Sequence, residues 1–151
     1  MFPAIIISLL KGCHSPGETI RHIISGCGRL ANGEYLHRHN QVAKIIHQQL
    51  ALHYQLVEFE VPYYNYVPDP VLENGHITLY WDQSIITDRT IVANKPDIVV
   101  IVRQALRTII NITIPHDENL VKAEKDKQIK YFDLAHEVVD MHLRPIEKYY
   151  I

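Results

Sequence analysis

Residues 94–115, "NKPDIVVIVRQALRTIINITIP", decide the fold because they hold two β-branched runs on either side of a short polar segment. Runs of this length and composition predict buried strands near residues 97–102 and 108–114. The two strands are close enough to pair as a hairpin around "RQALR", although this segment lacks the glycine, asparagine or proline of a usual tight turn. Asp97 is the acid at the start of the first strand, and Asn111 lies within the second.

Asp97 and Asn111 are an even number of positions apart, so in a tight hairpin they can share a face and converge at its open end. Two carboxylates at such a point would hold a divalent cation through oxygen ligands, activate a water and screen a phosphodiester. Here the second position is an amide. Two interpretations stay open: a metal site that has lost one carboxylate, or a structural pair in which Asp97 follows Pro96 in a turn and Asn111 satisfies an edge-strand hydrogen bond.

The region before the hairpin begins with a predicted long helix. From Asn32, which is suited to an N-cap, apolar residues recur with the spacing of one helical face as far as His53. The histidines of this helix fall on several faces, which favours packing and surface roles over coordination: His37, His39, His47 and His53.

A connector and one further strand separate this helix from the hairpin. The segment 57–70, "VEFEVPYYNYVPDP", has three prolines and predicts an extended connector rather than a packed element. Asn74 and Gly75 form a turn signal before the alternating segment "ITLYWD" at 77–82, which predicts a strand. The order of helix, strand, strand, strand and helix indicates an α+β or α/β-like fold with a short mixed sheet between two long helices.

The last predicted helix runs from Asp117, as N-cap, to about Leu143. Its stripe of core-facing positions includes Lys127, with Tyr131 one turn further on. A lysine on such a stripe usually extends its ammonium group to water. In the functional alternative, Lys127 is a cation directed at a developing phosphate charge.

Composition limits the classes of function. The chain has 151 residues, 47% of them hydrophobic and 21% charged, and a net charge of -2, so we expect one compact domain without strong autonomous binding to nucleic acid. Two cysteines are too few for a disulfide scaffold and are compatible with a reducing compartment. The opening "MFPAIIISLL" is too short to span a membrane. We therefore expect no membrane association and a nuclear or cytoplasmic location.

Five blocks of the chain together resemble a known family: "ETIRHIISGC", "EYLHRHNQVAKIIHQQLA", "YWDQSIITDRTIVANKPDIVV", "ITIPHDENLVKAEKDKQIKY" and "DLAHEVVDM". In this order they are similar to the C-terminal region of site-specific non-LTR retrotransposon polyproteins, across residues 10 to 142. There a CCHC zinc knuckle precedes a restriction-like endonuclease of the PD-(D/E)XK type. The resemblance implies a zinc-knuckle-like segment at 1–31, an endonuclease-like domain at 32–151, and DNA and a reverse transcriptase polyprotein as partners.

In that family, the endonuclease nicks target DNA to prime reverse transcription. The resemblance implies that Asp97 binds Mg²⁺ or Mn²⁺, that Lys127 and Tyr131 are the following helix's catalytic residues, and that position 111 is a second aspartate. Asn111 departs from this pattern, since "INITIP" stands where "DITIP" or "DIAIP" is expected. We therefore expect the fold to persist and catalysis to be feeble or absent.

The knuckle departs from the family as well. Its expected Zn²⁺ ligands match Leu10, Cys13, His22 and Cys27, and a leucine cannot coordinate zinc. Weak zinc binding and no zinc binding are both open. After "MHLRPIEKYYI" the family pattern would continue into a further hydrophobic strand, so we expect the sheet to lack its last strand.

Three functions remain open from the sequence. The chain is a metal-dependent DNA endonuclease domain, a catalytically silent nuclease-like module that binds nucleic acid or a protein, or a relic of a transposable element without selected function. The first is an enzyme, whereas the second is a pseudoenzyme. The amide at position 111 favours the second hypothesis over the first. Glycine-rich phosphate loops and the common hydrolase motifs do not occur in the sequence.

Overall fold

A five-stranded mixed sheet is the centre of the computed structural model, which describes residues 20, 22, 27–103, 107–114, 120–140 and 146–150. The strands follow one another across the sheet in chain order, and the first four pair antiparallel while the fifth is parallel to the fourth. They are β1 (Val71–Glu73), β2 (Ile77–Trp81), β3 (Ile98–Val102), β4 (Arg107–Asn111) and β5 (Ile146–Tyr150). The chain is thus of the α+β class, as the sequence predicts.

Two hairpins build the antiparallel part. Asn74 makes the first turn, because its Oδ1 accepts hydrogen bonds from the backbone N–H groups of His76 (3.0 Å) and Ile77 (2.9 Å). The second hairpin joins β3 and β4 with Ile98 opposite Ile110, so the predicted pairing of the two β-branched runs is confirmed. Both strands are shorter than the sequence indicates.

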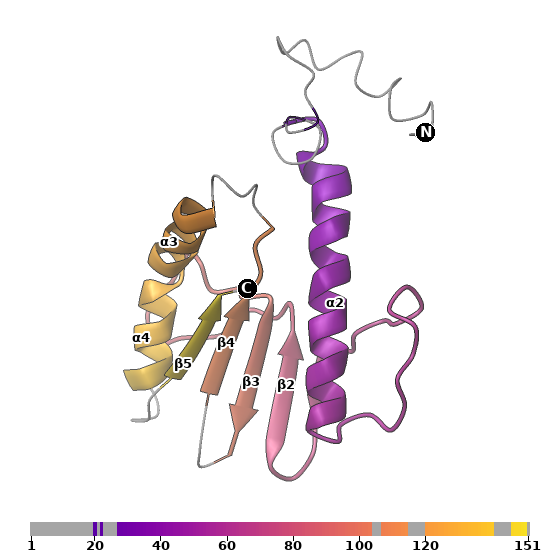
Figure 1. Ribbon diagram of the computed structural model, residues 1–151. Coiled ribbons are helices and arrows are strands. Elements are labelled where there is room, and N and C mark those ends of the chain that lie inside the picture. Colours follow the sequence, from indigo (N-terminus) through magenta and orange to yellow (C-terminus); the bar gives the residue numbers. More distant parts are fainter. Residues whose placement is uncertain are drawn as a thin grey trace.

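Helices cover both faces of the sheet (Figure 1). One helix, α2 (Leu36–His53), packs on one face, while α3 (Leu120–Lys130) and α4 (Phe132–Asp140) lie on the other side, beside β5. Alternation along the strands supplies both cores, since successive side chains point to opposite faces. Ile98, Val100 and Ile110 pack with α2, whereas Ile109 packs with Leu134 of α4.

The helices differ from the prediction at three points. Asn32 lies inside a π-helical turn, Ala31–Tyr35, that leads directly into α2, so it is not the N-cap. The single long helix expected after Asp117 is two helices that meet at Tyr131. Backbone hydrogen bonds from Tyr131 to Lys127 and from Ala135 to Tyr131 continue across the junction, so the break is local.

Two strands lie where no strand is predicted. β1 has only three residues and follows the proline-rich connector, so its sequence carries little alternation. β5 pairs along its length with β4, from Arg107 opposite Ile146 to Asn111 opposite Tyr150. The expectation of a missing last strand is therefore wrong for the sheet as described, because the segment after Pro145 itself extends the sheet beyond β4.

The connector 57–70 forms no helix or strand, as predicted, but two contacts fix it to α2. The hydroxyl of Tyr66 lies 2.8 Å from Nδ1 of His47, and both side chains are buried. Gln48 donates a hydrogen bond to the carbonyl of Val61 at 2.9 Å. The connector is therefore packed at two points, although it lacks regular structure.

Candidate functional site

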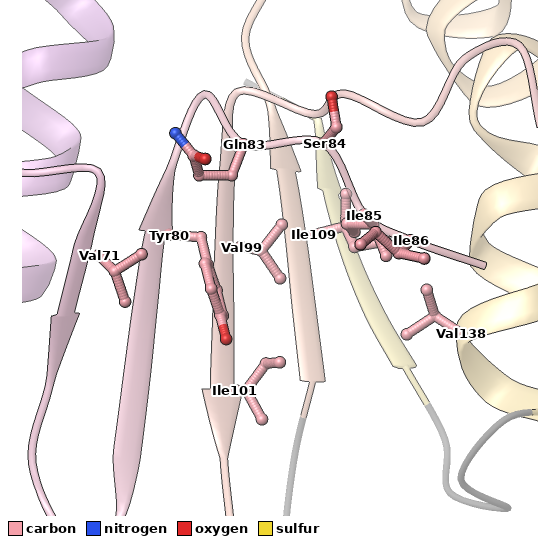
Figure 2. Close-up of a pocket in the computed structure, with 10 residues that line it drawn as sticks. All are labelled: Val71, Tyr80, Gln83, Ser84, Ile85, Ile86, Val99, Ile101, Ile109 and Val138. Atoms are coloured by element: carbon pink, nitrogen blue, oxygen red, sulfur yellow. The ribbon is translucent and has the colours of Figure 1, made fainter.

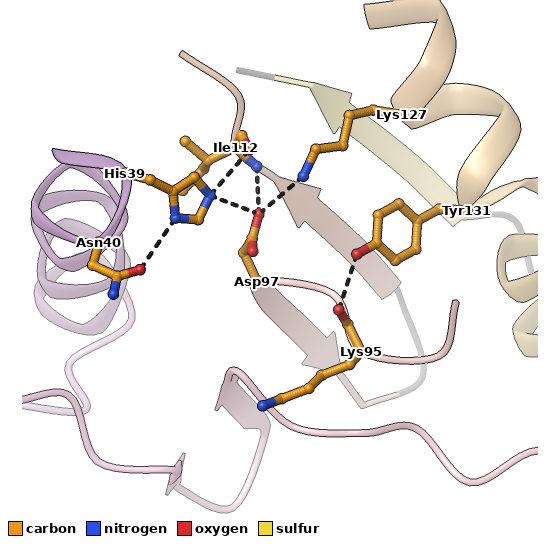
Figure 3. Close-up of polar contacts among 7 residues, drawn as sticks. All are labelled: His39, Asn40, Lys95, Asp97, Ile112, Lys127 and Tyr131. Carbon is orange, nitrogen blue, oxygen red and sulfur yellow. Dashed lines mark hydrogen bonds and ion pairs between the residues drawn. The ribbon is translucent and has the colours of Figure 1, made fainter. Parts of the chain in front are cut away.

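The hairpin of β3 and β4 brings Asp97 and Asn111 together. Extending the register by one residue beyond Ile98 and Ile110 sets Asp97 opposite Asn111, and directly opposite residues have side chains on the same face of the sheet. The backbone N–H of Ile112 donates a hydrogen bond of 2.6 Å to Oδ2 of Asp97 (Figure 3). The carboxylate thus lies against the end of β4.

Helix α2 contributes His39 to this carboxylate (Figure 3). Nε2 of His39 lies 3.1 Å from the carbonyl oxygen of Ile112 and 3.5 Å from Oδ2 of Asp97. Both oxygens are acceptors at this point, so Nε2 must carry the hydrogen. On the other side of the ring, Nδ1 lies 3.2 Å from Oδ1 of Asn40. The sequence indicates only a packing or surface role for His39, whereas in the structure its ring also contacts the carboxylate of Asp97.

Helix α3 contributes Lys127 from the opposite side. Its Nζ lies 3.9 Å from Oδ2 of Asp97, and its side chain is only 22% exposed, so the ammonium group does not extend freely into water. Lys127 and Lys130 both lie over the ring of Tyr131, with Nζ 5.8 Å and 4.9 Å from its centroid. The sequence placed Lys127 correctly on an inward-facing position of its helix.

Tyr131 lies near the site without reaching the carboxylate in any described contact. It is buried, and its hydroxyl donates a 2.9 Å hydrogen bond to the backbone carbonyl of Lys95, two residues before Asp97 (Figure 3). This bond holds the segment that leads into β3 against the junction of α3 and α4. The geometry makes Tyr131 a positioning residue, which differs from the catalytic role implied by the resemblance.

The electrostatics of the cluster follow from these contacts. Burial works to raise the pKa of Asp97, but the contact with His39, the hydrogen bond from Ile112 and the charge of Lys127 hold that pKa below its usual value. The contact with Asp97 raises the pKa of His39 despite the opposing effect of burial. Burial lowers the pKa of Lys127, and the attraction of Asp97 offsets part of this effect. One ionised carboxylate therefore faces two side chains that favour positive charge.

Asn111 is the unsatisfied member of the site. The residue is 1% exposed, and its Oδ1 has no hydrogen-bond partner among the residues that the structure describes. An unpaired buried amide oxygen costs about 1–3 kcal/mol of folding free energy. The structural alternative, in which the Asn111 side chain satisfies an edge-strand hydrogen bond, does not explain why its Oδ1 is buried without a partner among the described residues.

The residues around Asp97 do not fit a divalent metal ion. Hard cations such as Mg²⁺ bind through several oxygen ligands, usually with more than one carboxylate or with phosphate oxygens. Among the described residues Asp97 is the one carboxylate at this point, its Oδ2 already accepts from Ile112, and His39 and Lys127 add positive charge. In the described part of the chain no group of three or more His, Cys, Asp or Glu residues could hold a metal.

The proposed zinc ligands are only partly visible. Leu10 and Cys13 lie outside the described residues. Cys27 is buried, its backbone N–H donates to the hydroxyl of Tyr35 (3.0 Å), and this hydroxyl donates to the backbone carbonyl of His22 (3.1 Å). Tyr35 thus ties the segment with His22 to the one with Cys27, and zinc binding stays a prediction.

A second concave region has fewer polar groups that could take part in binding or catalysis. An apolar cavity of about 380 Å³ opens on the sheet face opposite α2, between the β-strands, the loop after β2 and α4 (Figure 2). Among the side chains that the structure describes, its polar lining consists of Tyr80, Gln83 and Ser84, without a carboxylate, histidine or lysine. Asp97 and its neighbours are therefore the candidate functional site.

Comparisons with known proteins add no assignment. No protein-family model matches the chain, and no curated protein or solved structure is significantly similar to it. Among the helices described, none combines the length and the apolar character needed to cross a membrane. The fold and the site define an α+β domain with a charged cluster at the open end of its central hairpin.

Proposed function

We propose that this chain is a degenerate restriction-endonuclease-like domain of a non-LTR retrotransposon polyprotein, in which metal-dependent nicking of DNA is lost or very weak. The observation that supports it most is the convergence of Asp97, position 111 and Lys127 from three separate elements at one end of the sheet. The mixed sheet with helices on both faces is compatible with the core expected from the resemblance. Its partners would be DNA and the rest of the polyprotein, in the nucleus or cytoplasm.

The amide at position 111 accounts for the loss of activity. At an effective dielectric constant near 20, a unit charge about 4 Å from an ion is worth about 4 kcal/mol for each ionic charge. Replacing a carboxylate by an amide removes this stabilisation, and about 1.4 kcal/mol corresponds to a factor of ten in rate or occupancy. Several orders of magnitude in metal-dependent cleavage are therefore lost.

The experiment is a nicking assay on supercoiled plasmid DNA with Mg²⁺ or Mn²⁺. The wild-type chain is compared with Asn111→Asp, alone and combined with His39→Ala, and each is repeated with Lys127→Ala as the site-specific control. We expect the wild type to show no metal-dependent nicking. At least one of the two variants that carry Asn111→Asp should nick DNA, and the addition of Lys127→Ala should abolish this activity. If no such variant nicks DNA, the proposed nuclease ancestry is contradicted.

Non-catalytic binding of nucleic acid is a second candidate, favoured by the surface of α3. None of the residues of α3 is buried, and the helix carries four lysines against two acids. Lysines on one exposed element bind phosphates without regard to sequence. We expect Lys122→Glu with Lys125→Glu to weaken binding of a DNA duplex at low salt, measured by fluorescence anisotropy, and Arg103→Glu at the far end of β3 to leave it unchanged. Equal effects of both changes would contradict specific binding through α3.

A further inference from the structure

We propose that the side-chain N–H of His39 occupies the place of the cation at Asp97, so that the protein's own imidazole closes the site to a metal ion. This inference rests on the proposed function, because it assumes that the carboxylate once faced a bound cation. It adds to Asn111 a second obstacle to metal binding, a side chain of α2 that lies outside the hairpin.

The geometry around Nε2 carries the argument. Two oxygens from different segments, Oδ2 of Asp97 and the carbonyl oxygen of Ile112, face the same ring nitrogen at 3.5 Å and 3.1 Å (Figure 3). A divalent ion binds oxygen ligands at about 2.0–2.6 Å. An ion in contact with both oxygens would lie on the hydrogen of Nε2, so the ion and the N–H exclude one another.

The ring cannot easily leave this position. His39 belongs to an 18-residue helix whose next turns pack into the main core through Val42, Ala43 and Ile46. Nδ1 lies within hydrogen-bond distance of Asn40, so both ring nitrogens have partners. Moving the ring would leave the carbonyl of Ile112 without this donor. The imidazole is therefore fixed on a rigid element, as a positioning group for the carboxylate.

The same contacts explain how the fold accommodates the charged carboxylate of Asp97 beside the core. Asp97 receives a backbone N–H from Ile112, the N–H of His39 and the ammonium group of Lys127, and its side chain is 18% exposed. These groups join α2, the hairpin and α3 at one point. A metal ion is not needed to compensate the negative charge, and restoring a second carboxylate does not by itself open the space that an ion requires.

The test is binding of Mn²⁺ to the whole chain, followed by the loss of the paramagnetic resonance signal of the free ion. Five proteins are compared: the wild type, His39→Ala, Asn111→Asp, Asn111→Asp with His39→Ala, and Asn111→Asp with His37→Ala. His37 is an exposed histidine of the same helix whose ring contacts Gln41, and it is the matched control. Circular dichroism verifies the fold, and His39→Ser replaces His39→Ala if the latter does not fold.

We expect only the variant with both Asn111→Asp and His39→Ala to bind Mn²⁺ saturably, at least about a hundredfold more tightly than Asn111→Asp alone. Equal binding by Asn111→Asp alone would overturn the inference, as would a folded His39 double variant that binds no Mn²⁺. Binding by the wild type that His39→Ala abolishes would also overturn it, because the ring would then be a ligand. If the double variant binds Mn²⁺ but leaves DNA intact, the inference stands and the proposed nuclease ancestry falls.

Discussion

The buried histidine of α2 makes the stability of this fold depend on pH. His47 is fully buried, with its Nδ1 2.8 Å from the hydroxyl of Tyr66 and its ring against the edge of Trp81 at a centroid distance of 5.4 Å. Burial lowers the pKa of His47 to about 4 from 6.5. Since the folded state resists protonation, its contribution to stability is complete above pH 6.5 and is lost as the pH falls toward 4.

The size of this effect follows from the shift. A difference of about 2.5 pH units corresponds to about 3 kcal/mol once both states are protonated, and to about 2 kcal/mol between pH 7 and pH 5. We expect the wild type to lose about 2 kcal/mol more unfolding free energy over this interval than His47→Gln, which keeps a polar partner for Tyr66 but does not titrate.

Urea unfolding at the two pH values measures the difference. Trp81 is the one tryptophan of the chain and contacts the His47 ring, so its fluorescence reports on the same region. His53→Gln, at an exposed histidine near the end of α2, is the matched control and should keep the pH dependence of the wild type. Equal pH dependence of the wild type and His47→Gln would refute the reasoning.

Three further changes probe the surroundings of the site. Tyr131→Phe removes the hydrogen bond to the Lys95 carbonyl, and we expect a loss of about 1 kcal/mol in thermal or urea unfolding; no loss would contradict its positioning role. Two contacts of Arg89 with Glu137, at 2.6 Å and 2.7 Å, hold the loop after β2 on α4. Glu137→Gln weakens them and should lower the unfolding free energy by about 1–2 kcal/mol. An unchanged midpoint of urea unfolding would show that other contacts hold the loop. Elemental analysis should find less than one zinc per chain, since Leu10 replaces a ligand, and stoichiometric zinc would show that the knuckle is intact.

The hairpin at the centre of the fold could be predicted because its two runs are locally unambiguous. Ile98–Val102 and Arg107–Asn111 consist largely of β-branched residues, and the even spacing of Asp97 and Asn111 places them on one face in the observed register, in which Ile98 lies opposite Ile110. Lys127 was also visible as a charged residue on an inward-facing helical stripe. These features depend only on periodicity within one or two neighbouring elements.

The rest of the site depends on contacts between distant segments. His39 lies 73 positions before Ile112, and helical spacing shows which face it occupies but not which groups lie opposite. The hydroxyl of Tyr131 turns to a backbone carbonyl, which no side-chain pattern specifies. β5 was missed for a related reason, because "IEKYY" acquires its strand character from pairing with β4.

Metal-dependent nicking by the His39→Ala, Asn111→Asp variant is the most direct test of the account. The account predicts that the wild type leaves supercoiled DNA intact in Mg²⁺ and Mn²⁺, and that the variant with both changes converts it to the open circle until chelator is added. Nicking by the wild type at the rate of this variant, or a well-folded variant that never nicks, would contradict the claim that Asp97 and position 111 descend from the metal-binding pair of a nuclease.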